Sequence, residues 1–328
     1  MSAERLARSI VALIAVVLPV AAVFAGKTGL AAGQPIEIHG TMSETGGWTP
    51  SDLTAAVGEP IRLRLTSDDV MHGFAIGQSD LPAVDVKPGE MTELTLTFEK
   101  PGKYTYYCTR WCGLNHWRMR GTIQVNGPDV ESLAAKPPLY VTLGIDIDAP
   151  RTASVLPARA PSAARGSQLG VAIPAEYLSR DHYRAHSPVE TWTAFRAASF
   201  TAGLGDGEVW DLVAFVWQSH TAPESFAEAA RLFAENCAAC HGERGAGDGV
   251  MAAELERQYS VSTHGTVSVA DFTDPIRMMS ASPALLQGKI VRGGMGTGMP
   301  YWGPIFSEAQ TWTLVDYLYN FQYEEEQP

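Results

Sequence analysis

Four residues between positions 108 and 119 have side chains that could bind a soft metal. Cys108, Cys112, His116 and Met119 form the pattern Cys-x-x-x-Cys-x-x-x-His-x-x-Met. Sulfur donors select copper, and an imidazole with a weak axial sulfur is the recurrent ligand set of copper electron-transfer sites. A second cysteine lets both thiolates bridge two copper ions, so that the charge of one electron is shared between the metals. The pattern therefore predicts a binuclear copper centre.

Such a centre needs a second imidazole, and His72 supplies one from an earlier predicted strand. A disulfide between Cys108 and Cys112 is an alternative in an oxidising compartment, but it leaves the histidines and Met119 unexplained. Zinc is a poorer alternative, because methionine is an unusual zinc ligand.

The second motif is Cys-x-x-Cys-His, at Cys237, Cys240 and His241, which is the pattern of covalent haem c attachment. A redox dithiol shares the cysteine spacing, but the adjacent histidine and a preceding helix favour haem, with His241 as an axial ligand. The other axial ligand is expected from the glycine-rich loop 293–302. Met299, just before a proline, is the first candidate and Met295 the alternative; methionine ligation raises the haem potential.

Short strands are expected to hold the copper motif. Alternation of apolar and polar residues in 61–65, 94–98 and 122–125, with Pro-Gly turns at 88–89 and 101–102, predicts a β-sandwich. We expect this domain to span 33–127.

Helices are expected to hold the haem motif. Phe226, Ala230 and Phe233 recur at helical spacing ahead of Cys237, and residues 307–310 form a capping-box pattern before the last apolar helix. A small α-domain over 223–328 is therefore predicted.

Two segments separate the domains. Residues 128–171 are predicted to be a linker, because 149–170 are rich in Ala, Pro, Ser and Gly and contain no acid. Residues 172–222 contain an apolar helix, 210–217, whose spacing matches that of 312–319. One interpretation is a degenerate cytochrome-like segment; the other is two unrelated amphipathic helices. This segment contains no cysteine, so it cannot hold a covalent haem.

The N-terminal residues 1–30 are predicted to be a membrane anchor or a signal peptide. Arg5 and Arg8 precede an uncharged apolar run over 9–26, which Lys27 follows. The run is slightly shorter than the roughly 20 residues usual for a span, and a cleaved signal sequence fits it as well. The basic flank predicts a single transmembrane helix, with both domains on the periplasmic side.

Composition excludes several classes of protein. A chain that is 45% hydrophobic and 18% charged is not made mainly of membrane spans, and a net charge of −12 argues against a nucleic-acid partner. Four cysteines in two tight pairs are too few for a disulfide scaffold. Because no nucleophile–base pair stands out, we expect no catalytic residues on this chain itself.

These motifs carry a resemblance to a known family. Residues 36–126 resemble the CuA domain of subunit II of haem–copper cytochrome c oxidase, and residues 224–323 resemble a class I cytochrome c, whose Met-Pro signature falls on Met299. The resemblance implies a cupredoxin domain, a Greek-key β-sandwich, followed by an all-α cytochrome domain. It also implies the copper ligands His72, Cys108, Cys112, His116, Met119 and the backbone carbonyl of Arg110, where the family usually has glutamate.

The resemblance further implies a respiratory electron-transfer subunit with two copper ions and one haem c. Its expected partners are a haem-containing membrane catalytic subunit and a donor, such as a soluble cytochrome c or a quinol-oxidising complex. The small subunit of a nitric oxide reductase and a free copper or haem electron carrier remain alternatives. The family commonly has two membrane helices, whereas this chain has one candidate.

Overall fold

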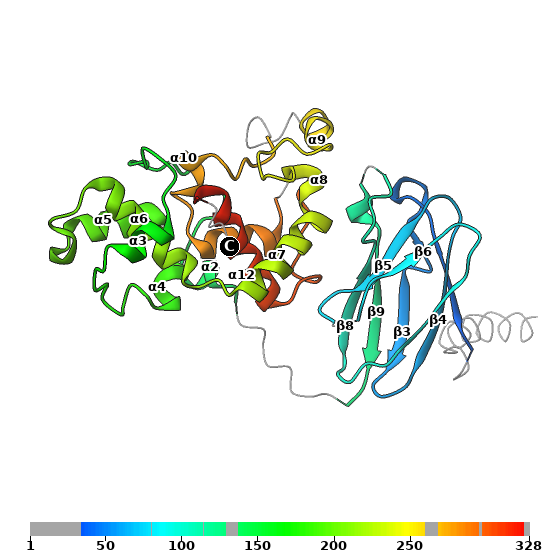
Figure 1. Ribbon diagram of the computed structural model, residues 1–328. Coiled ribbons are helices and arrows are strands. Elements are labelled where there is room, and N and C mark those ends of the chain that lie inside the picture. The colour runs from blue at the N-terminus through cyan, green and yellow to red at the C-terminus, as the bar shows by residue number, and fades with distance from the viewer. Residues whose placement is uncertain are drawn as a thin grey trace, which may run out of the picture.

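The computed structural model describes residues 34–79, 81–113, 115–128, 137–259, 268–294 and 297–324. It contains a β-sandwich and a helical domain (Figure 1). The predicted anchor or signal peptide at 1–30 lies outside the described residues. Among the described residues, no helix is both long enough and apolar enough to cross a membrane.

The β-domain consists of two sheets, with strand orders β2-β1-β4-β7 and β3-β9-β8-β5-β6. The β1–β4 and β3–β9 pairs are parallel and the other pairs are antiparallel. The fold is cupredoxin-like, as predicted. The strands are β1 (Ile36–Gly40), β2 (Trp48–Thr49), β3 (Asp52–Ala56), β4 (Ile61–Ser67), β5 (His72–Ile76), β6 (Val84–Val86), β7 (Thr92–Leu96), β8 (Gly102–Tyr107) and β9 (Arg120–Asn126).

The apolar residues of the alternating pattern form the core of the sandwich. In β4, Ile61, Leu63 and Leu65 are buried while the arginines between them reach solvent. Successive strand residues point to opposite faces, so one face of each sheet meets the other sheet. Trp48, Phe74 and Tyr106 fill the centre, with ring centroids 5.1–6.2 Å apart.

The second domain is helical, as predicted. Its apolar side chains form one continuous core that includes Phe233, Trp312 and Val315. The helices are α2 (Leu139–Thr142), α3 (Ala163–Gln168), α4 (Arg180–Ala185), α5 (Pro188–Ala197), α6 (Asp206–Gln218), α7 (Pro223–Asn236), α8 (Ala238–His241), α9 (Ala252–Gln258), α10 (Pro275–Met278), α11 (Pro283–Arg292) and α12 (Glu308–Tyr319).

Side-chain caps fix where several of these helices begin. The predicted capping box at the start of α12 is confirmed: the Gln310 amide donates to Ser307 Oγ, and the Ser307 amide donates to Gln310 Oε1. Ser187 caps α5 and Ser282 caps α11 in a related way, each followed by proline at the first helical position.

Residues 139–170, predicted to lie in a linker, contain α2 and α3 and contribute Ile147 and Ala163 to the helical core. The buried carboxylate of Asp211 in α6 fastens this segment. It accepts hydrogen bonds from the Ser162 amide at 2.8 Å and from Arg165 Nε at 3.0 Å. Composition alone did not reveal this ion pair, because its partners lie more than 40 residues apart.

The two helices with matching spacing, α6 and α12, belong to the same core. Trp217 of α6 and Tyr319 of α12 meet edge to face, with ring centroids 6.1 Å apart. Both helices present apolar faces to a shared interior, which either interpretation of 172–222 allows.

Candidate copper and haem sites

Sheet pairing brings the copper motif together at one end of the sandwich. Cys108 directly follows β8 and Met119 directly precedes β9, and these neighbouring strands pair Tyr107 with Arg120. The loop between them therefore begins and ends at the same place in the sheet, where the Cys108 amide donates to the Met119 carbonyl at 3.0 Å. His72 begins β5, which runs antiparallel to β8, so it lies at the same end.

The sulfur and nitrogen donors of this motif lie within a few ångströms of one another. Cys108 Sγ is 3.8 Å from Cys112 Sγ and 3.9 Å from His72 Nδ1, and Cys112 Sγ is 3.9 Å from Met119 Sδ. The Arg110 carbonyl oxygen lies 3.2 Å from Cys108 Sγ. Donor atoms of His72, Cys108 and Cys112 all fall within 4.8 Å of one another. The side chains predicted as ligands from the loop and from β5 thus share one buried cluster.

One buried histidine nitrogen near the cysteines lacks a hydrogen-bond partner, and a bound metal would explain this. His116 is buried, and among the described residues its Nδ1 has no hydrogen-bond partner. An unpaired buried nitrogen costs free energy, so such an atom usually serves a ligand or an unseen partner. With two thiolates, two imidazoles and a thioether, the donor set matches the soft chemistry of copper. The residues therefore fit a copper centre.

The two thiols differ in how readily they ionise. Their mutual hydrogen bond lowers the pKa of Cys108 to about 3, and the histidines beside it act in the same direction. The same hydrogen bond, together with burial, raises the pKa of Cys112. Both sulfurs must be thiolates in a bridged metal centre, so metal binding would release the proton that the pair shares.

Asp69 orients His72, a role that the sequence analysis did not assign. Its Oδ1 lies 2.8 Å from His72 Nε2, which leaves Nδ1 facing the sulfur of Cys108. Asp69 is held in turn by the amides of Met42 and Val70, each at 2.6 Å. Carboxylates commonly orient metal-binding imidazoles in this way. The signal in the sequence was an aspartate three positions before the histidine.

Two glycines leave room for this arrangement. A Cβ on Gly40 would lie 2.8 Å from the Trp48 ring and 3.1 Å from His72, and a Cβ on Gly73 would lie 2.1 Å from the Thr109 hydroxyl. At Gly73 the missing side chain lets the cysteine loop lie close over β5, and at Gly40 it leaves room for the rings of Trp48 and His72.

Arg110 presents only its backbone to the cluster. Its guanidinium lies at the surface and pairs with Asp85, with Nε 2.9 Å from Oδ1. This separation of side chain and carbonyl agrees with the ligand role that the family resemblance implies, and it shows how arginine is accommodated where the family usually has glutamate.

In the haem motif, the histidine is oriented by the backbone. His241 Nδ1 lies 3.0 Å from the Ala270 carbonyl, which leaves Nε2 to face a metal. Its ring stacks on Phe272, with centroids 4.6 Å apart. Burial lowers the pKa of His241, so that the neutral form, which binds metals, is favoured.

The thiols of this motif suit thioether attachment better than redox exchange. Both are free, and burial raises the pKa of Cys237 to about 12 and also raises that of Cys240. A redox dithiol has the opposite property, a stabilised thiolate. Cys237 and Met299 both pack against the hydrophobic core of the helical domain. The residues therefore fit a haem c. Met295, the alternative ligand, lies outside the described residues.

Comparison with known proteins agrees with this division of the chain. Residues 49–126 match the family model of the cytochrome c oxidase subunit II periplasmic domain, and residues 224–318 match that of cbb3-type cytochrome c oxidase subunit III. Two curated relatives, each a cytochrome c oxidase subunit 2 from Thermus thermophilus, are 39% identical over 79 residues, 24% of this chain. The match spans about half the length of these relatives, 58% and 46%.

Solved structures that match part of the chain were also found. One is a heme-copper terminal oxidase dimer, with 23% identity over 38% of this chain and 100% of that one, and a TM-score of 0.25. Another is the periplasmic domain of cytochrome oxidase subunit II of Bradyrhizobium japonicum, with 21% identity over 31% of this chain and 89% of that one, and a TM-score of 0.26. By its family matches, the chain joins a cytochrome c oxidase subunit II domain to a cytochrome c domain.

Proposed function

We propose that this chain is the electron-transfer subunit of a haem–copper terminal oxidase. In this role it accepts electrons from an external donor at haem c, passes them to CuA, and delivers them to a haem-containing catalytic subunit that reduces oxygen. The observation that carries the proposal is the buried cluster of His72, two cysteines and a methionine, with His116 buried beside Cys108, on the same chain as an oriented Cys-x-x-Cys-His motif.

The residues that would hold each cofactor follow from the site. His72, Cys108, Cys112, His116, Met119 and the Arg110 carbonyl would bind two copper ions, and Cys237, Cys240, His241 and Met299 would hold the haem. The cofactors supply one-electron redox chemistry, while the protein fixes their positions and environment. Burial of the copper-ligand side chains keeps water away from their donor atoms.

We further propose that residues 1–30 anchor the chain in the membrane once, with both domains outside the cytoplasm. The support is the basic flank ahead of the apolar run. N-terminal sequencing of the purified protein checks this: a first residue near Gly26 or Lys27 would indicate a cleaved signal peptide.

The test of function is purification of the chain from its native membrane with whatever large subunit accompanies it. We expect a haem-containing membrane subunit and consumption of oxygen with a reduced cytochrome c. Consumption of nitric oxide instead would identify a reductase subunit, and purification without any catalytic partner would identify a free electron carrier.

The proposed direction of transfer has its own test, stopped-flow reduction followed separately at haem and copper wavelengths. The haem should be reduced first. If copper were reduced at the wild-type rate in a chain lacking haem, through Cys237→Ala and Cys240→Ala, then the haem would not be the entry point.

A further inference from the structure

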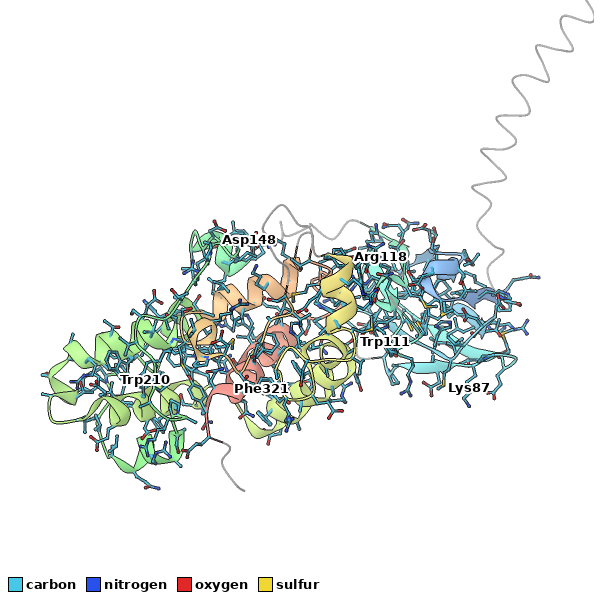
Figure 2. The ribbon with its side chains drawn as sticks, turned by 90° about the horizontal axis from the view of Figure 1, so that it is seen from above. Lys87, Trp111, Arg118, Asp148, Trp210 and Phe321 are labelled. Atoms are coloured by element: carbon cyan, nitrogen blue, oxygen red, sulfur yellow. The ribbon has the colours of Figure 1, made fainter. Side chains whose placement is uncertain are left out.

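The copper loop faces the helical domain. Trp111, which is 44% exposed, and Arg118 both lie on the side of the sandwich near the helices (Figure 2). Arg118 Nη2 lies 3.5 Å from the Tyr259 hydroxyl just after α9. The side chain of Tyr107, at the end of β8, packs against the helical core.

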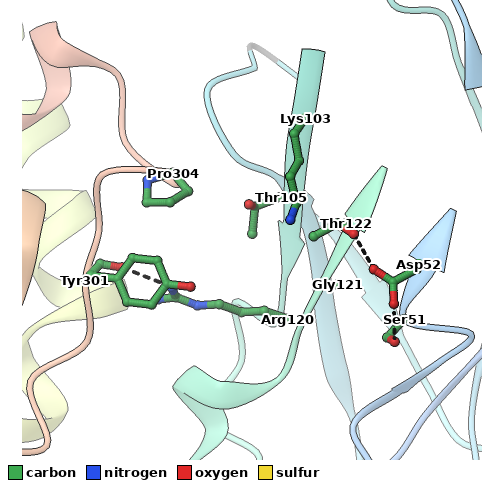
Figure 3. Close-up of a pocket in the computed structure, with 9 residues that line it drawn as sticks. All are labelled: Ser51, Asp52, Lys103, Thr105, Arg120, Gly121, Thr122, Tyr301 and Pro304. Carbon is green, nitrogen blue, oxygen red and sulfur yellow. Dashed lines mark hydrogen bonds between the residues drawn. The ribbon is translucent and has the colours of Figure 1, made fainter. Parts of the chain in front are cut away.

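One arginine connects the segments that carry the two predicted methionine ligands. Arg120 immediately follows Met119, and its Nη1 donates to the Tyr301 carbonyl at 2.9 Å, two residues beyond Met299 (Figure 3). Its guanidinium also lies over the rings of Tyr301 and Trp302, with Cζ 4.9 and 5.5 Å from the centroids.

The surroundings of Arg120 are unusual for a partly buried cation. Within the described ranges it forms no ion pair with a carboxylate, and its recorded partners are one carbonyl and two aromatic faces. Removing a guanidinium from water without an anion costs free energy, which only such contacts offset here. A planar group that stacks and donates at the same time also fixes orientation, which a lysine does not do.

A second contact holds the same loop to the segment that follows β5, a strand of the same sheet as β9. The Gln78 amide donates to the Ile305 carbonyl at 2.8 Å, and Gln78 Nε2 donates to the Gly303 carbonyl at 2.7 Å. A Cβ on Gly77 would lie 2.4 Å from the Pro304 carbonyl oxygen, so the close approach depends on glycine. Residues 301–305 are thus fastened to β9 at one point and to the chain after β5 at another.

We propose that Arg120 is a positioning residue that docks the loop carrying Met299 onto the start of β9, next to Met119. The arginine completes a continuous path between the two methionines. The path runs from Met119 along the backbone to Arg120, through the Arg120 side chain and its hydrogen bond to the Tyr301 carbonyl, and along the backbone to Met299. Electron tunnelling falls off more steeply across gaps than through bonds, so a fixed hydrogen bond favours transfer. The step moves one electron from haem to copper, with no bond broken and no proton moved. The inference rests on the proposed function.

Substitution of Arg120 in the full-length, copper- and haem-loaded chain tests the proposal. Arg120→Ala should leave the copper and haem spectra intact but slow electron transfer from haem to copper, after flash reduction, by about tenfold or more, because small misplacements have large kinetic effects. Arg120→Lys should recover only part of the rate. Arg62→Ala, an exposed arginine on the opposite sheet, is the matched control and should behave as wild type.

A second measurement reports docking without reference to electron transfer. Hydrogen exchange of backbone amides in 297–306 should become faster in Arg120→Ala and in Gly77→Ala, which disturbs the same interface without touching the arginine. Unchanged exchange and an unchanged rate in Arg120→Ala would overturn the proposal while leaving the proposed function intact. Absence of haem-to-copper transfer in the wild-type chain would instead overturn the proposed function.

Discussion

The copper and haem sites orient their histidines by different means. In the sandwich, a side chain does so: Asp69 holds Nε2 of His72. In the helical domain, the backbone does so: the Ala270 carbonyl holds Nδ1 of His241. A side-chain partner can be removed by one substitution, whereas a carbonyl persists whatever residue carries it. The copper site is therefore the more easily altered by changes outside its ligands, and the following predictions test that difference.

The largest expected effects come from the cysteines, and they should be confined to one site each. Cys112→Ser should abolish the mixed-valence copper spectrum, because each thiolate is proposed to bridge both metals. It should leave the haem spectrum unchanged. The double variant Cys237→Ala, Cys240→Ala should abolish the haem spectrum and leave the copper spectrum unchanged. Optical and paramagnetic resonance spectra of each variant are the measurement, and loss of both spectra from either change would show that the sites are not independent.

The matched control within the copper loop is Arg110→Ala. It removes the ion pair with Asp85 but keeps the carbonyl, so the copper spectrum should survive. Loss of that spectrum would contradict the assignment of the carbonyl as a ligand.

Removal of each orienting partner compares the two sites directly. Asp69→Asn should weaken copper binding by about 10- to 100-fold, the usual cost of losing such a partner. Ala270→Ser changes only a side chain and leaves the carbonyl, so the haem midpoint potential should stay at the wild-type value. Competitive copper titration and redox titration are the measurements. Equal sensitivity of the two sites would remove the proposed distinction.

Met299→Leu should lower the haem midpoint potential, because the thioether stabilises reduced iron, and should leave the copper spectrum unchanged. Met119→Leu should alter the copper spectrum and spare the haem. Potentiometry on both variants checks this pair. A wild-type potential in Met299→Leu would point to Met295 as the ligand.

The smallest effect concerns a carboxyl group away from both sites. Burial raises the pKa of Asp316 from 3.8 to about 6, against the opposing hydrogen bond from Tyr183. The folded chain then holds a proton that the unfolded chain releases, so this group lowers stability as pH rises from 3.8 to about 6. Asp316→Asn should remove that dependence and stabilise the domain above this range by roughly 1–3 kcal/mol. Denaturant unfolding at several pH values measures it.

Local patterns allowed the strands, the last helix and its cap to be predicted, because alternation and capping act over a few residues. The candidate copper donors in the loop could also be named, since Cys108, Cys112, His116 and Met119 lie within twelve consecutive residues. The orientation of His72 by Asp69, the anchoring of 139–170 by Asp211 and the contact of Arg120 with Tyr301 were not predicted. Each depends on tertiary pairing, which a local pattern does not encode.

The Gln78 contact joins residues 225 positions apart, so it cannot form until Gly303 has been synthesised. The sandwich, by contrast, is complete once β9 has emerged. Because domains generally fold in order from the N-terminus, the cysteine loop is in place while the last helices are still to come. The proposed copper loop is therefore formed before residues 301–305 are present to dock against the sandwich.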